Sequence, residues 1–333
     1  MAVTLKDVAE LAGVSRSAVS RTYTEGASVS AKTRKKVQEA AETLGYSPNA
    51  LASSLTTGRT KMIGLVSNNF HNPIFLEVFD LFTKGLQGRG LRPLLVNLTD
   101  ETDPEKSVRM LQQYSVDGVI VASSTLPESF AEAFRIAGVP VVHSFGRQVE
   151  KPTVNVLGID NKQAGRLAAE TLIARGYTRV GFLGGPQAAT STQDRMTGFL
   201  DTLQVHSNVG VTASFASAYS FEAGRAEMLR LMDAPLAEAY FCGDDVLSIG
   251  VLSALQSHGL SVPDDVGIIG LNDMEMAAWD NINLTTIHNP IAEIIASSVN
   301  LVADMVQDSA MTPQARLFAC HVVERGTLRA LKS

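Results

Sequence analysis

Cysteine is scarce in this sequence, and the patterns that mark metal sites and secretion are missing. The 333 residues include two cysteines, Cys242 and Cys320, with no C-x-x-C pair and no cluster of His and Cys. Two cysteines cannot form a disulfide framework, and they suit a reducing compartment. The first residues, MAVTLKDV, lack the basic and apolar regions of a signal peptide, and no apolar run is long enough to cross a bilayer. We therefore expect a cytoplasmic protein that binds no metal.

Catalytic motifs are missing as well. There is no G-x-S-x-G sequence to form a nucleophile elbow, and Ser, His and Asp are scattered along the chain. The run Gly184-Gly185-Pro186 lacks both the lysine of a phosphate-binding loop and the glycine spacing of a dinucleotide-binding fold. We expect neither an enzyme nor a bound cofactor.

The net charge of −6 hides an uneven distribution. Residues 1–60 carry eight Lys/Arg against five Asp/Glu, a net of +3, and the remainder carries 20 against 29, a net of −9. A small basic head on an acidic body fits DNA binding through the head alone. Because +3 is modest, one head should bind DNA weakly, so we expect a homodimer.

Residues 3–21, VTLKDVAELAGVSRSAVSR, predict two short helices joined by a tight turn. Thr4 with Asp7 approximates a capping box, Gly13 suits the turn, and Ser15 can cap the second helix. Apolar residues at helical spacing mark the inner side of the pair: Leu5, Val8, Ala9, Ala12, Ala18 and Val19. An ordinary helical hairpin would share single features, but their joint placement favours a DNA-reading helix-turn-helix.

A third helix and a linker follow. Ser30 can cap a helix within residues 31–46, and Gly45 provides its stop signal. We expect the basic residues near the start of this helix to contact phosphates. Residues 47–60 form the linker, in which Ala50 to Leu55 can form one or two helical turns. So short a helix is unstable alone, because nucleation outweighs its few hydrogen bonds.

From Lys61 onward, strands alternate with helices, which predicts parallel sheets covered by helices on both faces. The first strand is MIGLVS, and the alternation restarts after VLGID, so the chain should form two lobes. LTTIHNP is the expected crossing segment. A doubly wound fold of this kind binds ligands at the carboxyl ends of its strands, in the cleft between the lobes.

Three segments, TLKDVAELAGVS, VSAKTRKKV and GYSPNALASSL, resemble the LacI/GalR family of bacterial transcription regulators, and the resemblance extends to about Arg325. It implies a helix-turn-helix domain over residues 1–46 and a hinge helix within 47–60 that folds on DNA and inserts Leu55 into the minor groove. It also implies a type I periplasmic-binding-protein-like effector domain over 61–333. The two discontinuous lobes should be about 61–160 with 290–312, and 161–289 with 313–333.

The resemblance carries two sets of site residues. The expected DNA contacts are Thr4, Ser15, Arg16, Ser17, Ser20, Arg21, Ser30, Lys32, Thr33, Asn49, Ala52 and Leu55. The expected effector contacts are Phe75, Gln163, Ser191, Arg195, Tyr219, Asp244, Asn272 and Asn289. Arg195, Tyr219 and Asp244 stand where the family has an arginine, an aromatic and an aspartate that reach the ligand.

The sequence departs from the family pattern at two positions. Thr24 replaces the common asparagine after the recognition helix, which removes a backbone contact to DNA. Asn272, in Gly270-Leu271-Asn272-Asp273, occupies the position of an aspartate that accepts sugar hydroxyls. Since Asn supplies one acceptor together with donors, the effector can be a sugar, a sugar acid or a sugar phosphate, and Arg195 would pair with an anion.

The sequence therefore predicts a transcriptional regulator, a repressor, whose affinity for operator DNA is controlled by a small metabolite held between two lobes. The alternative is a periplasmic-type solute-binding protein without a regulatory role, which would share the lobes but needs a signal peptide and no DNA-binding head. The last residues, RGTLRALKS, are too short for the heptad tail of a tetramer, so we expect a dimer.

Overall fold

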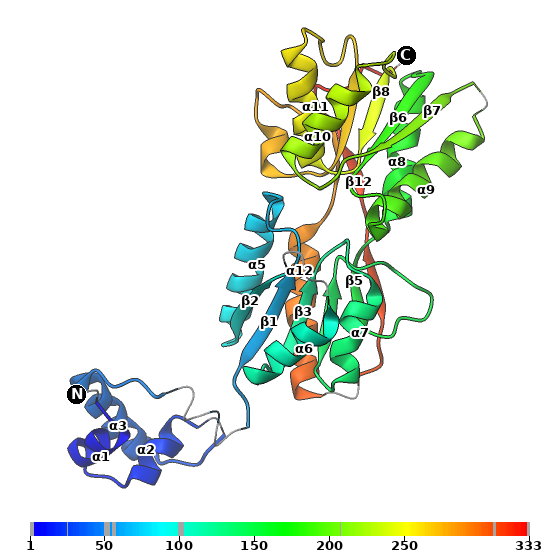
Figure 1. Ribbon diagram of the computed structural model, residues 1–333. Helices are drawn as coiled ribbons and strands as arrows, with labels where there is room; N and C mark the ends of the chain where they lie inside the picture. The colour runs from blue at the N-terminus through cyan, green and yellow to red at the C-terminus, as the bar shows by residue number, and fades with distance from the viewer. Residues whose placement is uncertain are drawn as a thin grey trace. The chain divides into compact units, whose positions relative to one another are not determined.

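The computed structural model describes residues 3–24, 26–49, 54, 58–98, 103–206, 208–308 and 311–331. The chain divides into two compact units, Met1–Lys61 and Met62–Ser333 (Figure 1). Within the described ranges, no helix combines the length and the apolar character needed to cross a membrane.

The N-terminal unit contains α1 (Leu5–Ala12), α2 (Arg16–Thr22) and α3 (Ala31–Leu44). Its helix boundaries are set by the residues that the sequence indicates. Thr4 and Asp7 form a complete capping box, and Gly13 ends α1 in the left-handed conformation at φ 63°. The Ser15 hydroxyl accepts from the backbone N–H of Ala18, and the Ser30 hydroxyl accepts from that of Thr33.

The small core of this unit explains how three short helices hold together. Its buried members are Val8, Ala9, Ala12, Val19, Val37, Ala40 and Ala41. Arg34 adds a polar tie, because its Nη1 donates to the backbone oxygen of Thr22 at 2.9 Å and so fixes the end of α2 to α3. Arg34 therefore has a structural role, whereas its neighbours Lys32, Lys35 and Lys36 are exposed.

The first lobe of the larger unit is built on a six-stranded sheet with strand order β11-β5-β4-β3-β1-β2, and every neighbouring pair is parallel. The strands are β1 (Met62–Ser67), β2 (Arg92–Asn97), β3 (Gly118–Ala122), β4 (Val141–Ser144), β5 (Asn155–Ile159) and β11 (Ala315–Phe318). The helices are α5 (Ile74–Gly88), α6 (Pro104–Gln113), α7 (Glu128–Ile136) and α12 (Ile291–Gln307). α5 packs with α12, and α6 packs with α7 (Figure 1).

The second lobe repeats this plan. Its sheet has the order β12-β10-β9-β8-β6-β7, parallel except for the antiparallel pair of β10 and β12. The strands are β6 (Arg179–Gly184), β7 (Gly210–Phe215), β8 (Ala239–Cys242), β9 (Gly267–Asn272), β10 (Thr286–His288) and β12 (His321–Val323). The helices are α8 (Asn161–Ala174), α9 (Thr190–Gln204), α10 (Phe221–Leu231), α11 (Asp245–Ser257) and the 3₁₀ turn η1 (Glu275–Ala278).

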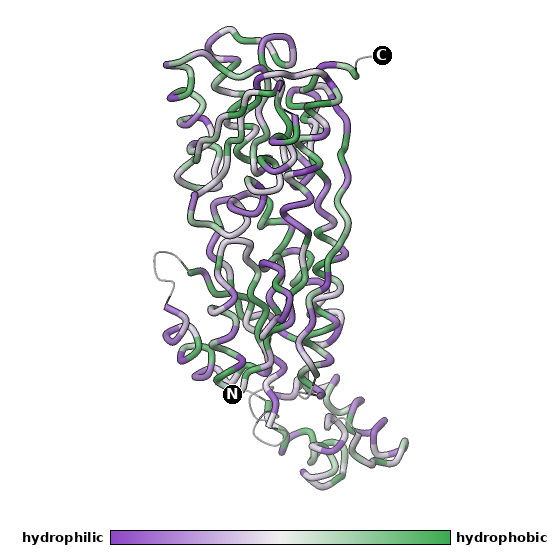
Figure 2. Tube along the Cα trace, turned by 90° about the vertical axis from the view of Figure 1, so that its right-hand side faces the viewer, coloured by the Kyte–Doolittle hydropathy of each residue, from purple (hydrophilic) through white to green (hydrophobic). Residues whose placement is uncertain are grey.

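Apolar strands and helix faces form the interior of both lobes. Figure 2 shows hydrophobic stretches running through each half of the larger unit, and the buried strands β1, β3 and β8 are almost entirely apolar. Such continuous apolar strands are expected where helices cover both faces of a parallel sheet.

The pair α8–α9 is packed unusually closely, which fixes the start of α9 in the cleft. A Cβ atom on Gly198 would lie 1.9 Å from the backbone oxygen of Lys162, and one on Gly165 would lie 2.1 Å from that of Arg195. Only glycine can occupy these two positions at this separation.

One expected boundary of the lobes needs correction, and two strands were not predicted. The boundary at 312/313 was placed too early, because β11 pairs with β5 and the chain returns to the second lobe only after Phe318. Residues 155–159 form the buried strand β5 of the first lobe, where the sequence suggested only a restart of the alternation. β7 was not predicted; it is a mostly exposed edge strand and so lacks a buried face to read from the sequence.

Candidate functional site

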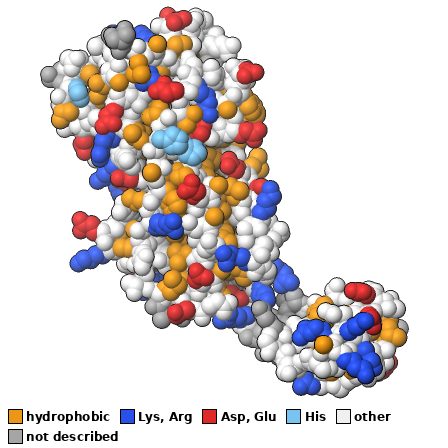
Figure 3. Space-filling model, turned by 180° about the vertical axis from the view of Figure 1, so that it is seen from behind, with side chains coloured by type: hydrophobic (Ala, Val, Ile, Leu, Met, Phe, Trp, Pro, Cys, Tyr) orange, Lys and Arg blue, Asp and Glu red, His pale blue; other side chains and the backbone are white. Residues whose placement is uncertain are grey.

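The first candidate site is the exposed face of α2. Arg16, Ser17, Ser20 and Arg21 are all exposed, whereas Val19 on the opposite side is fully buried. Arg21 Nε donates to the backbone oxygen of Ser17 at 3.3 Å, so its side chain lies along the helix. Figure 3 shows Lys and Arg side chains gathered on the visible face of the N-terminal unit. The arrangement presents donors for base edges and phosphates on a helix that can enter a major groove.

The other predicted DNA contacts fall into three groups. Thr4, Ser15 and Ser30 are exposed helix caps whose side chains accept backbone N–H groups. Lys32 and Asn49 are exposed, and Thr33 is half-buried with its hydroxyl 2.9 Å from that of Ser30. Ala52 and Leu55 lie outside the described residues.

The second candidate site is a cavity between the two lobes, at the carboxyl ends of the strands. Its polar lining consists of Asn69, Asn72, Ser124, Asn161, Arg195, Tyr219, Asp244, Asn272 and Asn289. Its apolar lining consists of Ile74, Phe75, Val78, Phe145, Ile159 and Ile291. Five of these residues are asparagines, each of which offers one acceptor and two donors.

Arg195 stands on α9 and is 4% exposed. Its Nε donates to Oδ1 of Asn161 at 2.8 Å, and its Nη1 donates to the backbone oxygen of Gly243 at 2.5 Å. Two of its three guanidinium nitrogens are thus engaged by the protein itself. The arginine braces α8 and the end of β8 as well as lining the cavity.

Asp244 is the N-cap of α11 and organises the cavity from the second lobe. Its Oδ1 accepts from the backbone N–H of Val246 at 2.9 Å, and its Oδ2 accepts from the amides of Asn72 at 3.1 Å and Asn272 at 2.9 Å. Burial raises the pKa of Asp244 to about 6, and the hydrogen bond from Val246, the charge of Arg195 and the two asparagine amides only partly offset that. Asn289 adds a further hydrogen bond to this network, because its side-chain amide donates to Oδ1 of Asn272 at 3.1 Å.

Six of the eight predicted effector contacts line the cavity: Phe75, Arg195, Tyr219, Asp244, Asn272 and Asn289. Gln163 and Ser191 do not. Gln163 is half-buried near the start of α8, and Ser191 is buried with its hydroxyl 3.3 Å from that of Tyr219. The sequence missed Asn69, Asn72, Ser124, Phe145 and Asn161. The available signals were weak. Asn69, Asn72 and Ser124 follow predicted strands. Phe145 ends one, and Asn161 opens the helix at which the alternation restarts.

Among the described residues, three polar contacts bridge the two lobes around the cavity. Besides the Asn72–Asp244 hydrogen bond, Arg147 of the first lobe forms a two-point ion pair with Asp194 on α9, with Nε to Oδ2 at 2.8 Å. The Thr190 hydroxyl donates to the backbone oxygen of Ser124 at 3.2 Å. The structure is therefore that of a closed cleft.

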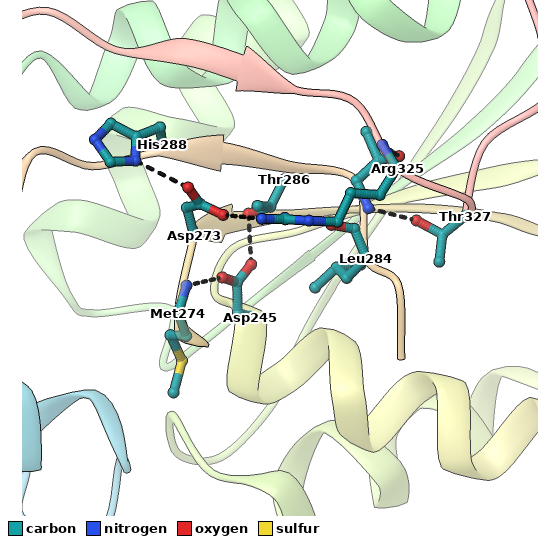
Figure 4. Close-up of polar contacts among 9 residues, drawn as sticks. Asp245, Asp273, Met274, Leu284, Thr286, His288, Arg325 and Thr327 are labelled. Atoms are coloured by element: carbon teal, nitrogen blue, oxygen red, sulfur yellow. Dashed lines mark hydrogen bonds and ion pairs between the residues drawn. The ribbon is translucent and has the colours of Figure 1, made fainter. Parts of the chain in front are cut away.

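A polar network behind the cavity connects it to the segments that cross between the lobes (Figure 4). Asp273 accepts from Arg325 Nη2 at 2.6 Å and lies 3.0 Å from His288 Nδ1. Burial raises the pKa of Asp273, but the hydrogen bonds from Arg325 and His288 outweigh burial and leave it below its usual value. Asp245 accepts from the Thr286 hydroxyl at 2.6 Å and from the backbone of Met274 at 2.9 Å, and burial raises its pKa to about 7.

Comparison with known proteins decides the family. Residues 4–49 match the model of bacterial regulatory proteins of the lacI family, and residues 169–328 match a periplasmic binding protein-like domain. The chain is 30% identical to the HTH-type transcriptional repressor PurR of Aliivibrio salmonicida (strain LFI1238), over 98% of this chain and 99% of the relative. It belongs to the lacI family.

Other members show the same likeness over their whole length. The HTH-type transcriptional repressor CytR of Escherichia coli (strain K12) is 30% identical over 99% of this chain and 97% of its own. The lac repressor dimer bound to operator and the anti-inducer ONPF superposes with a TM-score of 0.87 at 26% identity, covering 99% and 100% of the two chains. A CelR–cellobiose complex gives 0.71 at 27% identity, covering 98% and 100%.

Membership in the lacI family settles the broad function. Since the relatives that match from end to end are helix-turn-helix repressors, the chain is a DNA-binding transcriptional regulator with a small-molecule effector. The alternative, a solute-binding protein without a regulatory role, is not supported.

Proposed function

We propose that this lacI-family regulator is a cytoplasmic repressor that binds operator DNA as a homodimer and releases it when an uncharged, polyhydroxylated metabolite occupies the cavity between the lobes. It acts by binding and not by catalysis. α2 reads bases, and residues 47–60 act as a hinge that responds to the geometry of the lobes.

The single observation that carries the choice of effector is the balance of charge in the cavity. Of the described residues that line it, Arg195 and Asp244 are charged, and the remaining polar side chains are neutral. Two nitrogens of Arg195 already donate to protein oxygens. An anionic ligand would meet a partly occupied guanidinium and the carboxylate of Asp244 together, which disfavours a sugar acid or a sugar phosphate.

Asparagine amides suit hydroxyl groups, because each amide can donate and accept at once. Phe75 and Phe145 supply apolar surface for the carbon skeleton of a ring. A neutral sugar or a related polyol matches both features, and we extend to this chain, as a proposal, the sugar binding that the name of the CelR–cellobiose complex states for that protein.

Support for the DNA half comes from the exposed face of α2 and from the lac repressor dimer, whose structure is described as bound to operator. The net of +3 over residues 1–60 is too small for one head to bind tightly, so two heads on one operator are needed. Asn49, Ala52 and Leu55 remain proposed hinge contacts.

A gel shift on the DNA upstream of the protein's own operon tests this proposal. Neutral sugars, sugar acids and sugar phosphates are added in turn, and binding of the same compounds is measured by calorimetry. We expect a neutral compound to bind and to release DNA. Arg195→Ala should abolish the response while keeping DNA binding without ligand. Loss of DNA binding in Arg195→Ala, with normal binding of the metabolite, would contradict the division of labour.

A further inference from the structure

His143, on β4, is a buried histidine that the proposed function does not use. It is 1% exposed, and its Nε2 lies 3.0 Å from the backbone oxygen of Ser123. Burial lowers the pKa of His143 to about 4, so the ring is neutral at physiological pH. Because a carbonyl oxygen can only accept, Nε2 carries the proton and donates to Ser123. Nδ1 is then an acceptor, and it has no hydrogen-bond partner among the described residues.

The hydrogen bond from His143 supports the turn that follows β3. Besides accepting this bond through its backbone oxygen, Ser123 accepts from the backbone N–H of Leu126 through its hydroxyl, at 3.1 Å. The next residue, Ser124, lines the cavity, and its backbone oxygen accepts from the Thr190 hydroxyl of the opposite lobe at 3.2 Å. His143 therefore holds the carbonyl group one residue before an acceptor that bridges the lobes.

The same ring supports the turn that follows β4. A Cβ atom on Gly146 would lie 2.7 Å from Cγ of His143 and 2.8 Å from its Nδ1, so the backbone at this position lies against the ring. Phe145, just before it, lines the cavity with a φ of 66°, a conformation that costs energy for residues other than glycine. Arg147, just after it, forms the ion pair with Asp194 of the opposite lobe. The ring thus packs against the turn that carries Arg147.

Two of the three contacts between the lobes therefore start from turns that touch His143. The third, from Asn72 to Asp244, starts from a different segment of the first lobe. Asn72 precedes α5, and its Oδ1 accepts from the backbone N–H of Ile74 at 3.2 Å. The structure thus offers a contact against which an effect of His143 on the other two can be compared.

We propose that His143 is a positioning residue for closure of the cleft. Through its hydrogen bond to Ser123 and its packing against Gly146, it holds both turns where they reach the second lobe. The inference rests on the proposed function, in which occupation of the cavity acts through the geometry of the lobes. It adds that one residue inside the first lobe, outside the cavity lining, sets that geometry on the first-lobe side.

Hydrogen exchange of the free, full-length protein, followed by mass spectrometry of its peptides, tests the inference without an effector. The readout is exchange in residues 189–197, at the start of α9 in the opposite lobe. This stretch contains Thr190 and Asp194, the second-lobe partners of the two contacts. His143→Leu, which cannot donate a hydrogen bond, should raise exchange there about threefold or more, because the start of α9 opens more often without its cross-lobe partners. Exchange in both first-lobe turns should rise as well.

Three further variants separate positioning from a general loss of stability. In His143→Gln the amide nitrogen can take the place of ring Nε2, so exchange should stay within about 1.5-fold of the wild type. In His143→Asn the shorter amide corresponds to ring Nδ1, does not reach Ser123, and should behave like His143→Leu. His258 lies at the exposed end of α11, with Nδ1 3.0 Å from the backbone oxygen of Ala254. His258→Leu is the matched control and should leave residues 189–197 unchanged.

Two backgrounds show through which contacts His143 acts. In Arg147→Ala/Thr190→Val both contacts are already absent, so adding His143→Leu should leave exchange at the start of α9 as it is in that parent. In Asn72→Ala the contact that is missing does not start from either turn. There, His143→Leu should keep the full effect that it has in the wild type, since independent contacts add.

The outcomes decide the inference by themselves. It is wrong if His143→Leu leaves residues 189–197 at wild-type exchange, or if it raises exchange equally in the Arg147→Ala/Thr190→Val background. Should His143→Leu fail to fold, the contrast between His143→Gln and His143→Asn decides, and equal exchange in these two overturns the inference. Because no effector enters these measurements, a failed screen for neutral metabolites would count against the proposed function and leave this result intact.

Discussion

Asn72 and Asp244, which lie 172 residues apart in the chain, meet across the cleft, with Asn72 Nδ2 donating to Asp244 Oδ2 at 3.1 Å. Asn72 precedes the first helix of one lobe, and Asp244 caps α11 of the other. Both are at least 95% buried, so the bond is shielded from water. It makes closure of the lobes depend on residues that also line the cavity.

Removing this bond should therefore weaken effector binding by weakening closure. We expect Asn72→Ala to raise the effector Kd about tenfold or more, equivalent to about 1.4 kcal/mol, because a buried carboxylate loses a donor. Operator affinity without effector should stay within about twofold. Calorimetry and a gel shift measure the two quantities. Asn97→Ala, at an exposed strand end, is the control; an equal loss there would show a general effect of removing an amide.

The pKa of Asp244 predicts a dependence of effector affinity on pH. Because burial raises that pKa to about 6, the carboxylate is ionised at pH 7.5 and takes up a proton as the pH falls through 6. The protonated form has lost acceptor capacity for Asn72 and Asn272, so the effector Kd should rise between pH 7 and pH 5.5. Calorimetry at several pH values should show this slope in the wild type and in Asp80→Asn, whose exposed carboxylate pairs with Lys84 of the same helix. Asp244→Asn should bind weakly at every pH, and a slope that persists in it would assign the titration elsewhere.

Removing a basic residue from α2 should change DNA binding differently from removing one from α3. Arg16 on the exposed face of α2 can bind guanine in a bidentate way, which is worth about 1–3 kcal/mol of discrimination. Arg16→Ala should thus relax the choice of base at one position in each half-site. Lys35 is exposed on α3, 3.8 Å from Glu39, and Lys35→Ala should weaken all DNA alike and reduce the dependence on salt. Selection of binding sites from a random pool of DNA measures the first effect. If the base preferences selected by Arg16→Ala equal those of the wild type, Arg16 does not read a base.

How much the sequence could predict depended on whether a feature is local. Thr4, Gly13, Ser15 and Ser30 cap or end helices through contacts within a few residues, and all four predictions are confirmed. Arg195 and Asp244 were predicted because they stand at positions where the resemblance to the family implies ligand contacts, and the structure brings both to the cavity.

What the sequence could not show depends on distant partners. Asn72 lies in a loop whose path is set by the opposite lobe, so its meeting with Asp244 has no local signal. β11 and β12 are separated by two residues but belong to different sheets, and a short apolar run gives no sign of such a change. The structural role of Arg34 could not be predicted from the sequence either. A hydrogen bond to the backbone oxygen of Thr22 distinguishes it from its exposed basic neighbours.

The carboxylate of Asp273 joins the cavity to two crossing segments at once. Asn272, which lines the cavity, and Asp273 both have positive φ, 124° and 58°, a conformation that costs energy for residues other than glycine. Asp273 then holds Arg325, which follows β12, and His288, which ends β10. The His288 and His321 rings are 4.8 Å apart, so the two crossing strands lie side by side at this point. We therefore expect a shift of Asn272 to reach both crossing segments through Asp273.

Asp273→Asn should consequently weaken the coupling between effector and operator more than it weakens either binding. The neutral amide loses the ion pair with Arg325, and it stands outside the cavity lining, so the effector Kd of the free protein should stay within about threefold. The ratio of operator affinities with and without effector should fall several-fold. Because coupling is reciprocal, the effector Kd measured in the presence of operator DNA must move toward that of the free protein by the same factor. Gel shifts measure the operator affinities with and without effector, and calorimetry independently measures the effector Kd with and without operator DNA. Asp304→Asn, near the C-terminal end of α12, should keep the wild-type ratio. A wild-type ratio in Asp273→Asn as well would show that the lobes transmit their state by another route.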